Sequence, residues 1–295
     1  MAIVVITDKP AQLGNQLWAF LNMTVLVKGY KKKSLLFLED KGFEQFELVK
    51  DKSIYALTKG TFLFSCWNYI IRFVRYRYQN PFWKQIFSIF CLHFKTGFID
   101  EKTFERDIKR VGFLFVESWP NRLHKNLPLM STAESRALFS FEKKLLTKVS
   151  SFLEQVRQSA NLIVGIHIRR GDYKYFQEGK YYFEDEVYLD YMQQLKNLFP
   201  EKNISFFIAS NEPFDQAYFA SVNCFQIAGA LPTDDLCGLS LCDYILGPMS
   251  TFSMWASYTG KVPLRFIETR NELLRLVDFK PVAAQDCFDP FIQNC

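Results

Sequence analysis

The sequence has no apolar run long enough to cross a membrane and no recognisable secretion signal. Its first ten residues, MAIVVITDKP, contain neither a basic segment nor a long apolar stretch. The aromatic run TFLFSCWNYII, residues 61–71, is shorter than the roughly 20 residues that a spanning helix needs. These absences predict a globular protein of the cytoplasm without a membrane-spanning helix.

Cysteine pairs of the metal-binding or redox type are also missing. The seven cysteines form no C-x-x-C pair and their number is odd, which favours reduced thiols over a disulfide framework or a zinc site. A net charge of +5 is small for 295 residues, so it favours anionic ligands without requiring nucleic acid. We therefore expect no nucleic-acid partner and no resident cofactor.

The chain divides into two halves that each begin with a strand signal. IVVI, residues 3–6, precedes a glycine-containing loop, a helix and a second strand, and NLIVGIHI, residues 161–168, begins a further series of alternating strands and helices. Such alternation predicts parallel sheets with helices on their faces. The predicted fold is α/β, with two Rossmann-like domains, 1–155 and 156–295, facing a cleft where ligands bind at the carboxyl ends of strands.

An aromatic and basic segment interrupts the first half around residues 60–95. Arg72, Arg75, Arg77 and Lys84 alternate there with tryptophan, tyrosine and phenylalanine. Two interpretations stay open. The segment is either a helix lying in the headgroup region of a membrane, or a helical insertion packed on the first domain with its arginines in water.

The charged loop after residues 162–168 is the strongest candidate for a ligand site. His167, Arg169, Arg170 and Asp172 lie at the end of this apolar run, and ligands bind at the carboxyl end of a central parallel strand. Two guanidinium groups suit a pyrophosphate, because each offers a planar fork of donors. The alternative is a surface loop with solvated arginines and Asp172 as a local ion-pair partner.

Two further segments indicate a polar ligand. Ser250 and Thr251 precede an amphipathic run, so one of them caps a helix whose free N–H groups suit phosphate, although capping alone would explain them. Gly14, Asn15 and Gln16 lie at the first strand-to-helix turn, where the glycine permits close backbone approach and the amides can hydrogen-bond a ligand. This turn lacks the G-x-G-x-x-G pattern of dinucleotide-binding loops, and an ordinary helix start would explain it equally well.

In their order along the chain these motifs resemble the α-1,2-fucosyltransferases, a GT-B glycosyltransferase family that uses GDP-fucose. The motifs are LGNQ, HIRRGD, SNE after a strand, and DLCGLSLCDYILGPMSTFSMWAS. The resemblance extends from about Ile3 to Leu264 and leaves the aromatic segment unmatched. The family's second motif usually reads S-D-D where this chain has residues 210–212, SNE, and its third usually has Asn where this chain has Met249.

The resemblance implies an inverting, metal-independent transfer of fucose from GDP-fucose to a hydroxyl, O2 of a galactose-like residue. The implied acceptor is a glycan or lipid-linked oligosaccharide in surface polysaccharide synthesis, held by the first domain. Arg169 and Arg170 would neutralise the leaving pyrophosphate, with Asp172 and Asn15 completing the catalytic set. The implied donor-binding residues are His167, Gly14, Gln16, Ser210, Asn211, Glu212, Asp235, Ser250, Thr251, Phe252 and Ser253.

No metal site is expected. FEDEV, residues 183–187, resembles a D-x-D metal motif, but its acids stand where first-turn acids of a helix would stand. A general base is not identified, and Asp172 and Glu212 are candidates. Two alternatives stay open: a transferase that uses another GDP-sugar or makes another linkage, and a non-catalytic nucleotide-binding or membrane-surface protein on the same fold. Contact of the aromatic segment with lipid would place the chain at the inner face of the cytoplasmic membrane.

Overall fold

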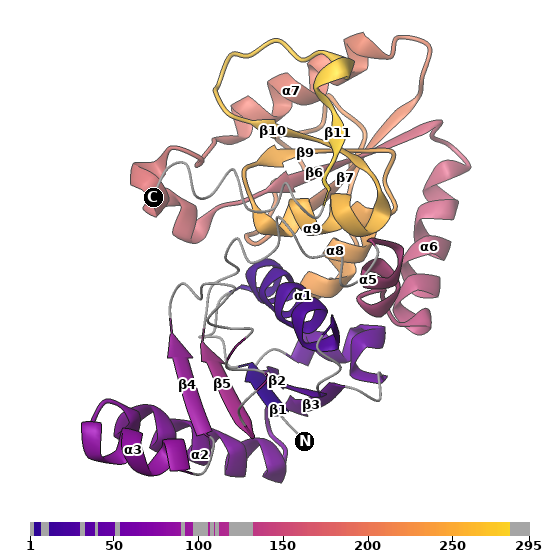
Figure 1. Cartoon of the computed structure of the whole chain (residues 1–295). Coiled ribbons are helices and arrows are strands. Elements are labelled where there is room, and N and C mark those ends of the chain that lie inside the picture. The colour runs from indigo at the N-terminus through magenta and orange to yellow at the C-terminus, as the bar shows by residue number, and fades with distance from the viewer. Residues whose placement is uncertain are drawn as a thin grey trace. The chain divides into compact units, whose positions relative to one another are not determined.

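A computed structural model describes ten parts of the chain. They are residues 3–6, 12–29, 33–38, 41–50, 54–89, 92–96, 106, 109, 112–117 and 132–283. The chain forms two compact units, one within Met1–Ser140 and the other Phe141–Cys287 (Figure 1). The assignment of acceptor and donor roles to the two parts stays a prediction.

The first unit is built on a sheet whose neighbouring strands all run parallel, in the order β3-β2-β1-β5-β4. The strands are β1 (Ile3–Ile6), β2 (Lys33–Leu38), β3 (Ile54–Thr58), β4 (Leu92–Thr96) and β5 (Phe113–Glu117). The helices described with them are α1 (Leu13–Gly29), α2 (Phe62–Tyr78), α3 (Pro81–Ile89) and α5 (Thr132–Leu138). The predicted strand-helix-strand unit at the start of the chain is confirmed, because α1 connects β1 to its parallel neighbour β2.

The aromatic segment belongs to this parallel sheet. Helices α2 and α3 connect β3 to β4, and β4, residues 92–96, is an edge strand of the sheet. The end of the segment that was expected to be an insertion is therefore a strand of the sheet. One side of α2 is apolar at Phe64, Ile71 and Val74, which are buried with Phe87 of α3. These spacings place the buried side chains on one helix face, where they pack with residues of the sheet.

The second unit contains a six-stranded sheet in the order β11-β10-β9-β6-β7-β8, in which β11 alone pairs antiparallel. Its strands are β6 (Leu162–Ile168), β7 (Ile204–Ser210), β8 (Cys224–Phe225), β9 (Tyr244–Pro248), β10 (Pro263–Ile267) and β11 (Lys280–Pro281). Its helices are α6 (Lys143–Arg157), α7 (Asp185–Leu198), α8 (Pro232–Ser240) and α9 (Thr251–Gly260). Two 3₁₀ turns, η3 (Gly171–Lys174) and η4 (Phe176–Gly179), follow β6.

Strand β6 is buried along its whole length, as an apolar run without alternation predicts for a central parallel strand. Val164 and Ile166 share a core with Tyr188 and Met192 of α7. On the other face Gly165 lies so close to α8 that an added Cβ would come within 2.6 Å of Leu239 Cδ2. The two faces of β6 are therefore covered by different helices, as in Rossmann-like sheets (Figure 1).

The cysteines that the structure describes are free thiols: Cys66, Cys224, Cys237 and Cys242. Burial, with the Asp234 carboxylate nearby, raises the pKa of Cys237 to about 12. Cys91, Cys287 and Cys295 lie outside the described residues. Within the described parts of the chain, none of the helices combines the length and hydropathy that a membrane span requires.

Candidate active site

The candidate site is at the carboxyl end of β6, where the connections of the second sheet change direction. From β6 the chain proceeds outward through β7 to β8, and it then returns to β9 on the opposite side of β6. Strands β6 and β9 are parallel neighbours, with Val164 paired to Tyr244 and Ile166 paired to Leu246. Such a switch point leaves a crevice outside the carboxyl ends of the two strands, which is where doubly wound sheets bind ligands.

His167 is the last inward-facing polar residue of β6 before the loop. Its side chain is buried and its ring centroid lies 5.2 Å from that of Phe252. Burial, together with the positive charge of Arg169, lowers the pKa of His167 from 6.5 to about 3. Among the described residues Nδ1 of this imidazole has no hydrogen-bond partner. The ring is therefore neutral at physiological pH, and one of its nitrogens is a proton donor and the other an acceptor.

The guanidinium group of Arg169 is held inside the loop. Its Nη2 lies 2.5 Å from Oδ1 of Asp172, and its Cζ stands 5.1 Å from the centre of the Tyr173 ring. The Arg169 side chain is buried, whereas more than half of the Asp172 side chain is exposed. The local ion pair that the sequence left as an alternative is thus formed, and the carboxylate remains accessible from solvent.

Arg170 is paired with a residue that the sequence gave no reason to connect with it. Its guanidinium group makes an ion pair with Asp185 in the first turn of α7. Among the described residues Nε of Arg170 is buried without a hydrogen-bond partner. The acids of FEDEV are confirmed as helix-start residues, with Glu184 as the N-cap and Asp185 and Glu186 in the first turn. No local spacing signals the pair, because fifteen residues separate its members.

The end of β7 contacts the same loop. The backbone N–H of Arg170 donates to Oδ1 of Asn211 at 2.8 Å, and Ser210 Oγ accepts from the N–H of Glu212 at 3.2 Å. Gly171 has a φ of +63°, and an added Cβ would lie 3.2 Å from Asn211 Nδ2 and 3.5 Å from Glu212 Oε1. The SNE motif therefore positions the arginine loop, a role that its place in the sequence did not reveal.

The amino end of α9 borders the site from β9. Ser250 is the N-cap, and its Oγ accepts from the N–H of Phe252 at 3.2 Å. The hydroxyl of Ser253 donates to the Ser250 carbonyl at 3.1 Å, and Thr251 begins the helix. Capping by Ser250, one of the two expected residues, is confirmed, and the capping hydroxyl is itself buried.

Tyr173 connects the two strand ends, although sequence analysis did not select it. Its hydroxyl donates to the carbonyl of Met249 at 2.8 Å, and burial raises its pKa. This bond joins the loop after β6 to the segment that precedes α9. An aromatic residue directly after HIRRGD was the only signal in the sequence that could have found it.

Asp235 lies in the first turn of α8, a helix that packs against α9. Burial, and to a smaller degree the neighbouring Asp234 carboxylate, raises the pKa of Asp235 to about 7. Asp234 is engaged elsewhere, since its Oδ1 lies 2.6 Å from Nζ of Lys148. Near neutral pH the Asp235 carboxyl group is present in both protonated and ionised forms, so it can donate or accept a hydrogen bond.

The remaining predicted residues are in the first unit. Gly14, Asn15 and Gln16 form the first turn of α1, and Gln16 is buried. They are therefore at a strand-to-helix turn, as expected. They belong to the first unit, whereas the cluster of His167, Arg169 and their neighbours belongs to the second unit.

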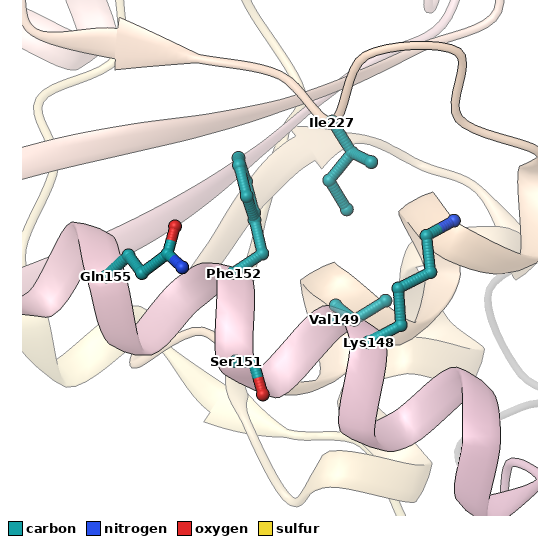
Figure 2. Close-up of a pocket in the computed structure, with 6 residues that line it drawn as sticks. All are labelled: Lys148, Val149, Ser151, Phe152, Gln155 and Ile227. Carbon is teal, nitrogen blue, oxygen red and sulfur yellow. The ribbon is translucent and has the colours of Figure 1, made fainter.

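A separate hollow of about 280 Å³ is found in the second unit (Figure 2). It is lined by Lys148, Val149, Ser151, Phe152, Gln155 and Ile227. Five of these residues are on α6 and the sixth lies between β8 and α8. None of the residues predicted to bind the donor lines it, so it is distinct from the candidate site.

His167 gives the site a measurable pH signature. Because its pKa in the folded chain is below 6.5, the unfolded chain binds the extra proton between about pH 3 and 6.5, and stability falls as the pH falls through this window. We expect the wild-type chain to lose about 2 to 3 kcal/mol more unfolding free energy than His167→Gln between pH 7 and 4.5. Urea unfolding at both pH values measures this difference.

The comparison with His167→Gln removes the opposing contribution of Asp235, whose raised pKa acts equally in both proteins. Equal losses in the two proteins would show that folding does not lower the pKa of His167. The amide of glutamine does not titrate and has a size similar to that of imidazole. A comparable unfolding free energy of the two proteins at pH 7 would show that the substitution itself is tolerated.

The cluster is suited to an anion that carries several phosphate oxygens. Two guanidinium groups, a neutral imidazole and the start of a helix lie around one switch point, and all of them can donate to oxygen. Asp172 and Asp185 neutralise the arginines in this structure. A phosphate ligand would compete with these carboxylates. Among the described residues no group of three His, Cys, Asp or Glu side chains is arranged to hold a metal ion.

Two α/β units built on parallel-dominated sheets are the architecture of the GT-B fold, and solved structures with this fold match the chain. Residues 124–262 match the family model described as Glycosyl transferase family 11. This segment contains HIRRGD, SNE and STFS, so the resemblance to a fucosyltransferase family predicted from these motifs is confirmed. No curated protein sequence matches the chain.

Solved structures of fucosyltransferases share the fold. POFUT1 in complex with GDP has a TM-score of 0.56 at 12% identity over 90% of this chain and 98% of its own. A mutant of FUT1 from Arabidopsis thaliana in complex with GDP has 0.59 at 13% identity, over 95% and 73%. NodZ α-1,6-fucosyltransferase co-crystallised with GDP has 0.51 at 14% identity, over 90% and 95%. At these identities the likeness establishes the fold.

Proposed function

We propose that the chain transfers fucose from GDP-fucose, with inversion, to a hydroxyl of a glycan acceptor, O2 of a galactose-like residue, in surface polysaccharide synthesis. The observation that carries this proposal is the pair Arg169 and Arg170 at the carboxyl end of β6, beside the start of α9. POFUT1 and NodZ, which share this fold, have been solved with GDP, and POFUT1 also with GDP-fucose, which supports GDP-fucose as the donor. The α-1,2 linkage rests on the motif resemblance.

In this mechanism the acceptor oxygen attacks the anomeric carbon of fucose while the bond from that carbon to the β-phosphate oxygen breaks. The electron pair of the broken bond leaves with GDP, and the proton of the acceptor hydroxyl passes to a base. Arg169 and Arg170 are proposed to stabilise the new phosphate charge. Because fixed guanidinium groups supply this positive charge, we propose that transfer needs no divalent metal. Asp172 and Glu212 stay candidates for the base.

The donor-binding roles are proposals of unequal support. Ser250, Thr251, Phe252 and Ser253 lie at the start of a helix, which suits the phosphates. His167, with a neutral ring whose Nδ1 has no partner among the described residues, is proposed to bind the nucleotide. Ser210, Asn211 and Glu212 hold the arginine loop, which supports a positioning role beside the donor. Asp235 is proposed to bind the nucleotide or sugar. For Gly14, Asn15 and Gln16 in the first unit, a role rests on the resemblance alone.

The fold also supports the alternative that the chain makes a different linkage, since NodZ, an α-1,6-fucosyltransferase, has the same fold. The SNE motif in place of S-D-D keeps another GDP-sugar as a second alternative. A glycan or lipid-linked oligosaccharide is the proposed acceptor, and the proposed location is the cytoplasmic side of a membrane, with peripheral contact.

Donor selectivity and metal independence form one test. We expect turnover of GDP-fucose to exceed that of GDP-mannose and UDP-galactose by roughly tenfold or more. We also expect calorimetry to give the same GDP affinity in EDTA as in Mg²⁺ or Mn²⁺, because the arginines carry the phosphate charge.

Each result has a distinct meaning. Preference for GDP-mannose would overturn fucose as the sugar, and preference for UDP-galactose would overturn the GDP-linked donor. GDP binding without turnover of any donor in the presence of acceptor glycans would favour the non-catalytic alternative. A strict requirement for a divalent ion in GDP binding would overturn the metal-independent mechanism.

A further inference from the structure

The outward side of α2 is aromatic where a surface helix is normally polar. The buried side of the helix consists of Phe64, Ile71 and Val74. These three side chains form the ordinary apolar stripe of an amphipathic helix. Phe62, Tyr69 and Tyr76 are 81%, 74% and 74% exposed. They are spaced seven residues apart, so they form a second stripe, which helical periodicity places roughly opposite the buried one.

Helix α3 extends this surface. Figure 1 shows α2 and α3 side by side, and Phe82 and Ile89 of α3 are also exposed. Arg77 of α2 joins the two helices, with its guanidinium carbon 5.1 Å from the ring centre of Trp83. We use the term α2–α3 surface for the exposed side chains of Phe62, Tyr69, Tyr76, Phe82 and Ile89 with the exposed bases Lys59, Arg72 and Lys84.

The positive charge of the chain is concentrated in this segment. Between Asp51 and Asp100 the sequence has seven of the 36 Lys and Arg residues and none of the 31 Asp and Glu residues. The rest of the chain therefore has 29 basic and 31 acidic residues, a net charge of −2, although the whole chain carries +5. The segment that exposes aromatic rings is also the source of the net positive charge.

We infer that the α2–α3 surface docks on an anionic lipid membrane. Aromatic side chains rest at the level of the headgroups, while nearby Lys and Arg attract anionic lipids. A second copy of the chain on this surface would bring two segments of the same positive charge together, which is unfavourable. The contact is peripheral, with the axes of α2 and α3 along the membrane plane.

Docking of this surface on a membrane would bring the proposed enzyme to its acceptor, because a lipid-linked acceptor lies in the same membrane. Only this link to the acceptor rests on the proposed function. None of its residues belongs to the candidate site, and binding to vesicles can be measured without donor or acceptor. Loss of one proposal would therefore leave the other standing.

Flotation of the full chain with vesicles tests the inference. We expect binding to phosphatidylcholine vesicles that contain phosphatidylglycerol, weak binding to phosphatidylcholine alone, and weaker binding at about 1 M than at about 0.1 M salt. The double variant Tyr69→Ser/Tyr76→Ser should lose about tenfold or more in partitioning. Arg72→Gln should lose about fivefold on anionic vesicles.

Matched variants in the second unit control for general stickiness and charge. Tyr218→Ser/Leu273→Ser removes two other exposed apolar side chains, and Arg270→Gln removes one other exposed positive charge. We expect both to float like the wild-type chain, and circular dichroism confirms folding of all variants. To locate the contact, Tyr69→Trp should gain fluorescence quenching by brominated lipids where Tyr218→Trp does not.

Three outcomes would overturn the inference. The first is that the wild-type chain shows no preference for anionic vesicles. The second is that the folded Tyr69→Ser/Tyr76→Ser variant binds these vesicles as tightly as wild type. The third is that sedimentation velocity shows a dimer for the wild-type chain and a monomer for this variant. A second copy of the chain would then be the partner that covers the surface.

Discussion

Arg170→Lys should lower kcat/KM for GDP-fucose by about 10² or more, which corresponds to roughly 3 kcal/mol of transition-state stabilisation. Lysine keeps the positive charge but lacks the planar fork that spans two phosphate oxygens. The structure adds that Arg170 is held by Asp185 and that its buried Nε has no partner among the described residues. If the phosphates of GDP-fucose replaced Asp185, the guanidinium group would keep an anionic partner.

The matched variants are Arg170→Ala and Asp185→Asn. Arg170→Ala should lose at least as much as Arg170→Lys, whereas Asp185→Asn retains the guanidinium group and should lose less than about tenfold. The ion pair is partly exposed, so its removal should change stability by only about 1 kcal/mol. Thermal melts check this point. Near-normal transfer by Arg170→Lys would mean that diffuse charge is sufficient at this position.

Gly247→Ala should destabilise the second unit by about 2 to 3 kcal/mol and weaken GDP binding. Gly247 is at the end of β9, next to His167 of β6. A methyl group there would lie 2.7 Å from the His167 carbonyl oxygen and 2.9 Å from its Cβ. The obstacle includes strand backbone, which cannot rotate away. Accommodation therefore requires the two strands at the switch point to separate, and His167 to shift with them.

Gly165→Ala is the matched control, because Gly165 is also a strand glycine next to a packed neighbour. Its added Cβ would meet the far end of the Leu239 side chain at 2.6 Å, and a side chain can change rotamer. We expect a loss of about 1 kcal/mol, with GDP affinity unchanged. Urea unfolding and calorimetry on both variants make the comparison. Equal losses of stability would indicate that strand spacing at the switch point is not the constraint.

Local patterns in the sequence were sufficient for many elements of the second unit. The apolar run 162–168 specified a buried strand, since side chains on both faces of β6 needed apolar surroundings. Ser250 before an amphipathic run specified a helix start, because a hydroxyl there satisfies a free N–H group. In the first unit, strands β3, β4 and β5 were missed. Strand β4 was missed because aromatic residues occur in α2 and α3 as well as in β4, so amino-acid composition does not show where the helices end and the strand begins.

The sequence by itself determined that two α/β halves exist, that the HIRRGD loop ends a central strand, and that positive charge and aromatic side chains concentrate between residues 51 and 100. Each of these facts depends on residues close together in the chain. Only the tertiary structure decided the strand order β9-β6-β7, which makes the end of β6 a switch point. It also decided that Arg170 pairs with Asp185 and that Tyr173 bonds to Met249. These contacts join residues 15 and 76 positions apart, and residues so distant meet only when the sheet and its helices pack, so no local periodicity records them.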